Sequence, residues 1–235
     1  MKINKLHSFQ VTYREALTIQ AALRGKRVIS DSPDLDLRLI AGADVSYARN
    51  SDFFFAAVVL LTYPGMEIVE TAYAALKSDF PYIPGLLTFR EGPALLAAFA
   101  KLRQPPDLII FDGQGIAHPR GLGLASHMGI LLACPTIGCA KTRLFGSYGI
   151  VGERAGDSVP LTAANDKIIG AVVRTKTRLK PLFISPGQGI SLQKSVEVVL
   201  NCCRGYRLPE PVRNAHLAVN RFRLSQAAIA PTSFP

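Results

Sequence analysis

Residues 37–76 read LRLIAGADVSYARNSDFFFAAVVLLTYPGMEIVETAYAAL and contain three runs of mostly apolar residues. The runs span Leu37–Ala48, Phe53–Tyr63 and Met66–Leu76, and turn-forming residues separate them, Asn50-Ser51-Asp52 first and Pro64-Gly65 second. Runs of this length joined by such short turns predict three consecutive antiparallel strands. This part of the chain is therefore expected to form a β-meander.

On both sides of the meander the pattern predicts alternating helices and strands. An amphipathic helix is predicted upstream, at Phe9–Arg27. Downstream, after a proline-bounded loop at Asp79–Gly85, a helix, a strand, a helix and a strand are predicted at Ala94–Leu102, Asp107–Asp112, Leu122–Ala133 and Thr136–Ala140. Two more strands and two more helices are predicted at Lys167–Thr175, Leu182–Ser185, Ser191–Cys203 and Pro211–Arg223.

Antiparallel strands that continue into parallel strands through crossover helices indicate one mixed β-sheet flanked by helices. This α/β arrangement has the shape of the ribonuclease H-like fold, and a chain of 235 residues suffices for one compact domain. We expect a single domain over residues 1–224. The uncharged segment 225–235 is expected to be a disordered tail.

The composition is that of a globular protein that needs neither a membrane span nor disulfides. Hydrophobic residues make up 49% of the chain, and the longest apolar run, Phe53–Leu61, is too short to cross a bilayer. No apolar leader follows the lysine-containing start, which predicts a cytoplasmic location. The four cysteines show no zinc spacing and are expected to be small core residues: Cys134, Cys139, Cys202 and Cys203.

The net charge of +10 is concentrated in one part of the chain. Between Lys167 and Arg223 there are eleven Lys or Arg residues and two acidic ones, which gives this basic segment a charge of +9. Such a field attracts polyanions, because each phosphate that is neutralised releases counterions. Nucleic acid is therefore a candidate partner, although an anionic membrane surface or solubility alone would also account for the charge.

Two aspartates stand where a carboxylate needs a partner. Asp44 lies inside the apolar segment LIAGADVSY (39–47), so a salt bridge, a strand-end cap or a metal ion must satisfy it. Asp112 closes the buried strand DLIIFD (107–112) and opens a glycine-rich loop. It fits either an ordinary Asp-Gly turn or a functional site, because sites in α/β sheets assemble at the carboxyl ends of strands.

Glu91, Lys141 and His216 also have ordinary structural explanations. Thr88 and Glu91 have the spacing of a helix capping box, whereas Pro93 favours a helix that begins at Pro93 and leaves Glu91 facing a site. Taken alone, His216 fits a satisfied histidine on a helix, and Lys141 fits a solvated lysine after a strand.

Taken together, these segments resemble the endonuclease V family, the deoxyinosine 3′ endonucleases of DNA repair. The resemblance runs from about Gln10 to Arg223. It is carried in order by ADVSY (43–47), PYIPG (81–85) with FRE (89–91), DGQGIAHPR (112–120), GLASH (123–127), AK (140–141), and LPEP (208–211) with AH (215–216). One departure is Gln188 in SPGQ (185–188), where the family is expected to carry histidine, so no role is assigned to that loop.

The resemblance implies a metal-dependent phosphodiesterase. It places Asp44, Glu91 and Asp112 around a divalent metal, His216 beside the reacting phosphate, and Lys141 as a further catalytic residue. Magnesium is expected, with manganese as a substitute, because hard cations take oxygen ligands and retain water. The implied reaction hydrolyses the second phosphodiester bond 3′ to a deoxyinosine and leaves a 3′ hydroxyl and a 5′ phosphate. No obligate protein partner is implied, and a monomer is expected.

The same resemblance implies how the damaged base is recognised. The loop Pro81-Tyr82-Ile83-Pro84 is expected to be a DNA wedge that fills the gap left by the extruded base. Hypoxanthine is expected to be read by the surroundings of Gly85, Leu87, Gly113, His118, Gly138 and Leu144. Phosphate contacts are predicted for two arginines of the basic segment, Arg213, which shares a helix face with His216, and Arg221.

Other functions are weighed against this one. An endonuclease acting mainly on inosine-containing RNA is the nearest alternative, since discrimination of the 2′ hydroxyl has no sequence signature. A non-catalytic binding module would have no use for clustered acids near phosphate. A zinc deaminase is excluded, because the sequence contains neither a His-x-Glu nor a Cys-x-x-Cys element.

Overall fold

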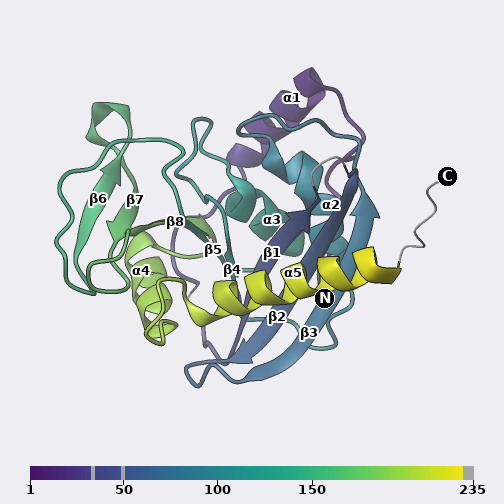
Figure 1. Cartoon of the computed structure of the whole chain (residues 1–235). Coiled ribbons are helices and arrows are strands. Elements are labelled where there is room, and N and C mark those ends of the chain that lie inside the picture. Colours follow the sequence, from purple (N-terminus) through teal and green to yellow (C-terminus); the bar gives the residue numbers. More distant parts are fainter. Residues whose placement is uncertain (33–34, 49–50, 230–235) are drawn as a thin grey trace.

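The predicted meander forms one side of an eight-stranded sheet (Figure 1). The computed structural model describes residues 1–32, 35–48 and 51–229. Within them, β1 (Leu39–Tyr47) pairs antiparallel with β2 (Phe53–Thr62), and β2 pairs antiparallel with β3 (Ile68–Lys77). The three strands begin and end within two residues of the predicted limits, so the meander is confirmed.

The rest of the sheet mixes parallel and antiparallel pairs. β4 (Leu108–Phe111) runs parallel to β1, and β5 (Thr136–Ala140) runs parallel to β4. β8 (Leu182–Gln188), β7 (Ile168–Val173) and β6 (Ser158–Thr162) follow as antiparallel neighbours. The order is β3-β2-β1-β4-β5-β8-β7-β6. The α/β mixed sheet is confirmed. β6 was not predicted, because this short edge strand contains a proline and buries little.

Helices cover both faces of the sheet. α2 (Leu87–Phe99) and α3 (Leu124–Leu132) pack on one face with α1 (Tyr13–Arg24) outside them, and α4 (Leu192–Asn201) and α5 (Glu210–Ile229) pack on the other (Figure 1). A short 3-10 helix spans Ala164–Asp166. Alternate residues of β4 serve the two cores: Ile109 and Phe111 face α2 and α3, whereas Leu108 and Ile110 face α4 and α5.

The start of α2 corrects both interpretations of Glu91. The helix begins at Leu87 and includes Pro93, so Glu91 lies inside it, and the N-cap residue Leu86 makes no side-chain capping hydrogen bond. Neither a Thr88/Glu91 capping box nor a helix beginning at Pro93 is present. The first turn is held by tertiary packing instead, because Leu86 and Phe89 are buried in a cluster with Ala16 of α1.

The end of α5 corrects the expected tail. The helix runs to Ile229, six residues beyond the predicted end at Arg223, so Ser225–Ile229 are helical rather than disordered. The sequence of these residues contains no helix breaker before Pro231, and it includes two alanines, which favour helix. Residues 230–235 of the expected tail lie outside the described residues.

No helix in the described ranges combines the length and the apolar character that a membrane span requires.

Candidate active site

Sheet register brings the two aspartates together. Ala43 of β1 is paired with Phe111 of the parallel strand β4, so Asp44 and Asp112 each lie one residue beyond the same rung of the sheet. Their parity directs both side chains to the face that α5 covers, because Ile40, Leu108 and Ile110 belong to the core on that side. Two carboxylates that are 68 residues apart in sequence therefore meet at one point of the sheet.

Helix α5 adds the histidine because it lies very close to β1. A Cβ atom on Gly42 would stand 1.9 Å from the carbonyl oxygen of Pro211, so only glycine permits this approach. Two residues along the strand, His216 Nδ1 lies 2.8 Å from Asp44 Oδ2. Two further residues along, the Ser46 hydroxyl donates to Asn220 Oδ1 at 2.9 Å. Alternate residues of β1 thus position successive turns of α5.

The hydrogen-bond partners of the His216 ring orient it. Nδ1 donates to the Asp44 carboxylate, and Nε2 receives the Asn220 side-chain amide at 3.3 Å. Arg223 supports the same network by donating to the Ser46 hydroxyl at 2.9 Å. The sequence interpretation assigned no role to Asn220 or Arg223. Spacing alone would have placed Asn220 one helical turn after His216.

Asp44, Asp112 and His216 form a group that fits a metal ion. Each offers one ligand atom, and these atoms lie within 4.8 Å of one another. Burial raises the pKa of Asp44, and the neighbouring Asp112 charge raises it further, against the opposing hydrogen bonds from His216 and Val45. A divalent cation would relieve this repulsion. Lys141, which follows β5, forms a close ion pair with Asp112 on the other side of the group.

Glu91 reaches the same centre from the opposite face of the sheet but is not one of these three. Burial raises its pKa to about 8, and the charges of Asp44 and Asp112 add to the shift while Arg90 opposes it. Because both aspartates act on its pKa, Glu91 lies within their electrostatic reach. Its role as a third metal-holding acid stays a prediction.

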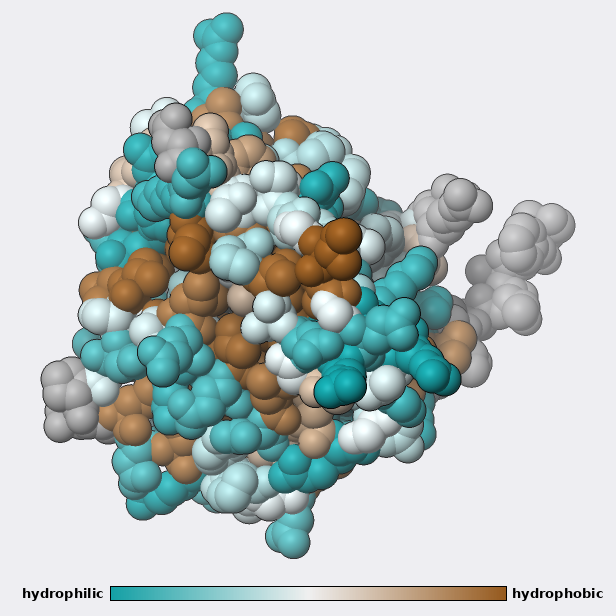
Figure 2. Space-filling view, turned by 90° about the vertical axis from the view of Figure 1, so that its left-hand side faces the viewer, coloured by the Kyte–Doolittle hydropathy of each residue, from teal (hydrophilic) through white to brown (hydrophobic). Residues whose placement is uncertain are grey.

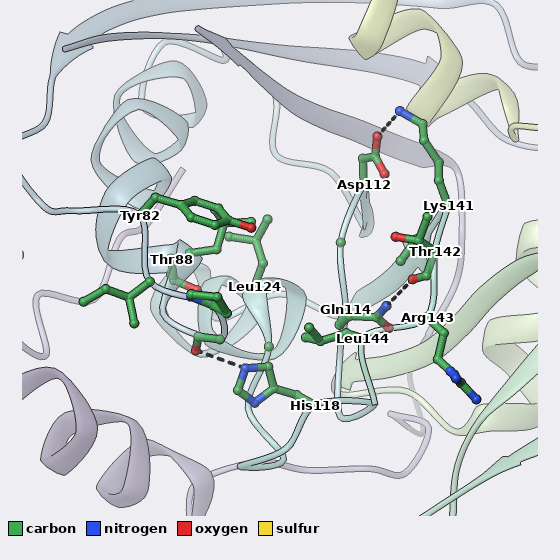
Figure 3. A pocket seen from close by; sticks show the side chains of 17 residues that line it. Tyr82, Thr88, Asp112, Gln114, His118, Leu124, Lys141, Thr142, Arg143 and Leu144 are labelled. Atoms are coloured by element: carbon green, nitrogen blue, oxygen red, sulfur yellow. Dashed lines mark hydrogen bonds and ion pairs between the residues drawn. The ribbon is translucent and has the colours of Figure 1, made fainter. Parts of the chain in front are cut away.

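A cleft of about 420 Å³ opens beside Asp112. Figure 3 shows Tyr82 on one side of it and Lys141, Thr142 and Arg143 on the other. The Tyr82 side chain is 62% exposed, and its flanking prolines are exposed as well. The loop predicted to be a wedge therefore presents an aromatic ring at the rim of the cleft that contains Asp112.

Most of the residues expected to read the base line this cleft. They are Gly85, Leu87, Gly113, His118 and Leu144. Gly138 does not line it. This residue is buried in β5, and a Cβ atom there would stand 2.2 Å from the backbone nitrogen of Gly115, so Gly138 allows close packing beneath the loop that follows β4.

His118 anchors the loop that carries Tyr82. Its Nδ1 accepts from the backbone N–H of Arg120 at 3.1 Å, so Nε2 carries the proton and donates to the carbonyl of Gly85 at 3.0 Å (Figure 3). Burial lowers the pKa of His118 to about 4, with a further contribution from the Arg120 charge, which keeps the ring neutral. The same carbonyl also accepts from Gln20 at 2.9 Å and from Arg120 at 2.7 Å. Gln20 was not predicted, because nothing in the sequence brings α1 to this loop. Arg120 belongs to the motif DGQGIAHPR (112–120), but no role was predicted for it.

Arg213, Arg221 and Gln188 occupy different settings. The Arg213 guanidinium is bound by Glu210 at 2.7 Å and lies 4.2 Å from the centre of the Tyr206 ring, whereas Arg221 is exposed on α5. Gln188, at the end of β8, accepts from the backbone N–H of Val28 at 3.0 Å. Its side chain ties the segment after α1 to the sheet, which is a structural role.

Sequence and structure comparisons with known proteins point to the same family. A family model described as Endonuclease V matches residues 21–217. Endonuclease V of Dehalococcoides mccartyi is 49% identical over 218 residues, which cover 93% of this chain and 97% of that protein. The crystal structure of Endonuclease V from Streptomyces avermitilis has a TM-score of 0.88 at 37% identity and covers 97% of this chain and 100% of its own.

A further relative was crystallised with nucleic acid. Endonuclease V of Ciona intestinalis, in complex with a 24mer DNA containing an inosine followed by a ribo-adenosine, is 27% identical with a TM-score of 0.77. The match covers 91% of this chain and 98% of that chain. With a family match over most of its length and a relative at 49% identity, this chain belongs to the endonuclease V family.

Proposed function

We propose that the protein is a DNA repair endonuclease that recognises deoxyinosine and hydrolyses the second phosphodiester bond 3′ to it, leaving a 3′ hydroxyl and a 5′ phosphate. The observation that carries the proposal is the group of Asp44, Asp112 and His216, whose ligand atoms lie within 4.8 Å, beside a cleft that Asp112 shares with the Tyr82 loop. The inosine-containing DNA bound by the Ciona relative supports the choice of base and polymer.

The donor set fits a hard divalent cation. Asp44 and Asp112 supply carboxylate oxygens from adjacent strands, and Glu91 adds a third acid whose pKa is raised by burial first and by the two aspartate charges second. Oxygen-rich sites of this kind suit Mg²⁺, and Mn²⁺ tolerates the additional imidazole. When bound, such an ion polarises a phosphate oxygen and lowers the pKa of a coordinated water.

Charge stabilisation and proton transfer are assigned to Lys141 and His216. The Lys141 ammonium lies beside Asp112, where it can neutralise charge that develops on the phosphate. The side chain of His216 is 45% exposed, and its ring is held at Nδ1 by Asp44 and at Nε2 by the Asn220 amide at 3.3 Å. Nε2 can exchange a proton with a reacting oxygen that takes the place of this amide. Both positions suit a hydrolysis in which charge builds up at the phosphate.

The cleft and the wedge loop account for base selection. Tyr82 stacks into the helix at the position that the extruded base leaves, and the base enters the cleft between the wedge loop and Leu144. The three donors that hold the Gly85 carbonyl fix the end of the loop, so Tyr82 loses little conformational freedom on binding. A mispaired base costs least to extrude, which favours the deaminated site.

The test is digestion of an end-labelled duplex with one deoxyinosine, with Mg²⁺, with Mn²⁺ or with chelator, beside an RNA strand of equal sequence. The expected product is a single nick at the second phosphodiester bond 3′ to the lesion. Its ends should be ligatable, and it should form only when a metal is present. Faster cleavage of the RNA would favour an endoribonuclease that acts on inosine-containing RNA. Binding without cleavage under every metal condition would make the protein a non-catalytic module and refute the proposal.

A further inference from the structure

A second cleft, of about 850 Å³, lies next to the first. It is lined by Lys141, Thr142 and Arg143, which also line the first cleft, and by residues of two other segments, Tyr148, Gly149, Ile150, Lys180, Pro181 and Phe183. The two clefts therefore adjoin at the segment that follows β5. Figure 3 shows the Arg143 side chain pointing away from the first cleft.

The lining of the second cleft is cationic. Lys141, Arg143 and Lys180 contribute to it, and no acidic residue does. The Lys141 ammonium is committed to Asp112, but Arg143 and Lys180 have no acidic partner within the described part of the chain. The active centre carries several carboxylates, whereas the adjoining cleft carries the opposite charge. A phosphodiester backbone that leaves the centre would find its counter-charges there.

The same cleft presents an aromatic ring. Tyr148 is 40% exposed, and its ring is braced by the edge-on ring of Phe183, with centres 5.5 Å apart, and by Arg143 at 5.7 Å. Ile150 beside it is 97% exposed. Figure 2 looks onto the end of the molecule that carries β6 and β7 and shows hydrophobic side chains gathered in a band between hydrophilic ones. A braced, exposed aromatic next to cations is the combination on which nucleic-acid bases stack.

Arg207 fixes the floor of this cleft. Its guanidinium donates to the carbonyl oxygens of Lys141 at 2.8 Å, Lys180 at 2.7 Å and Pro181 at 3.0 Å. Three hydrogen bonds from one rigid group join the segment after β5 to the segment before β8. The position of Lys141 relative to Lys180 and Pro181 is therefore fixed by the fold, and the cleft needs no rearrangement on binding.

We propose that the second cleft binds the substrate strand next to the cleaved bond, on the side of Lys141 that faces away from the base pocket. One base stacks on Tyr148, and backbone phosphates lie beside Arg143 and Lys180. The inference rests on the proposed function, because it needs a nucleic-acid strand that passes through the active centre. It assigns to the protein a contact with nucleotides beyond the lesion and its scissile bond.

The experiment measures strand affinity against strand length. An inosine-containing strand is shortened one nucleotide at a time from either end, and binding is followed by fluorescence anisotropy in chelator. With the wild-type protein, affinity is expected to fall at one truncation on one side. Tyr148→Ala and Lys180→Gln are each expected to lose about tenfold more affinity for the long strand than for the truncated one. Tyr148→Phe keeps the ring and should restore most of that difference.

Lys2→Gln is the matched control. It removes one charge beside Pro106 and Pro135, at the amino ends of β4 and β5 and thus at the opposite end of the strands from Asp112 and Lys141, so it should bind all lengths as the wild type does. If wild-type protein cleaves inosine strands but every variant shows the same length dependence, the second cleft is not a strand site and the proposal fails alone. Equal loss on long and short strands also refutes it. Failure of the wild-type protein to cleave any strand would instead overturn the proposed function.

Discussion

The orientation of His216 depends on Asn220, which lies on the same helix one turn later and touches neither aspartate of the centre. Asn220 receives the Ser46 hydroxyl at its Oδ1 and offers its amide to the His216 Nε2, so it sets the rotation of the imidazole above Asp44. Loss of such a supporting partner typically costs about 10- to 100-fold in activity. Asn220→Ala is therefore expected to lower kcat for nicking by roughly that factor with little change in KM. Asn214→Ala, on the same helix but bonded to Glu210, is the matched control and should leave kcat unchanged. Equal kcat values for the two variants would show that Asn220 does not position the histidine.

Asp112 is expected to couple metal binding to stability. A ligand that binds only the folded state adds about 2.7 kcal/mol to stability at a hundredfold excess over its Kd. In a chain of this size that corresponds to a rise in Tm of roughly 5–10 °C. Wild-type protein should show this rise on addition of Mg²⁺ or Mn²⁺, and Asp112→Asn should lose most of it together with nicking. An undiminished rise in the variant would place the metal elsewhere.

His127 should make the protein sensitive to mild acid. Burial lowers its pKa to about 3, with a further contribution from His7, whose Nε2 lies 2.7 Å from the Nε2 of His127. Because the pKa is depressed in the folded state, the unfolded chain takes up the proton first, and stability falls as the pH drops below the unfolded value of about 6.5. The expected loss at pH 5 is about 2 kcal/mol. Urea unfolding at pH 8 and pH 5 measures it as the difference between wild type and His127→Phe, because the shifted pKa values of His118 and Glu91 act on both proteins alike. An equal change in stability between the two pH values for wild type and His127→Phe would contradict the assignment.

The loop that carries Tyr82 is held at one end, while its tip is exposed. The Gly85 carbonyl is bound by donors from α1 and from the loop that follows β4, while the Tyr82 ring is exposed. A stacked aromatic is worth about 1–3 kcal/mol, so Tyr82→Ala should reduce the preference for inosine-containing over undamaged duplex by about tenfold or more. Tyr82→Phe should retain it. The ratio of the two Kd values in chelator is the measurement, and an unchanged ratio for Tyr82→Ala would remove the loop from lesion recognition.

The elements differ in how far sequence could predict them. The strands of the meander were predicted within two residues, because positions such as Ile40 and Ala41 are buried on opposite faces and the strands therefore read as continuous apolar runs between turn residues. The start of α2 was missed, since Leu86 and Phe89 form its first turn by packing on α1, a contact far away in sequence. The pairing of Asp44 with Asp112 depends on register, and that of Asp44 with His216 depends on Gly42 meeting Pro211. Only the family resemblance joined these residues beforehand.

Many of the cations in the basic segment are bound by other groups of the protein itself. Arg207 donates to three carbonyls, and Arg174 and Arg204 also donate to backbone carbonyls. Lys194 and Arg213 are paired with Glu197 and Glu210. These cations add to the long-range field that attracts a polyanion, but their directions are fixed by internal partners. Fewer side chains are therefore free to contact phosphate than the charge of +9 suggests.

Arg221 and Arg213 differ in whether an internal partner binds the guanidinium, and they therefore differ as phosphate contacts. Arg221 is exposed on α5, and no acidic partner for it lies within the described residues, whereas Arg213 would have to leave Glu210 before it could bind a phosphate. Arg221→Gln is thus expected to weaken inosine and undamaged duplexes equally and to lower the slope of log K against log salt by about 0.9. Arg213→Gln should change that slope less, although Arg213 is the arginine that shares a helix face with His216. Arg38→Gln, which removes an exposed charge just before β1, serves as the control. A wild-type slope for Arg221→Gln would place this part of α5 away from the nucleic acid, because a lost phosphate contact cannot leave counterion release unchanged.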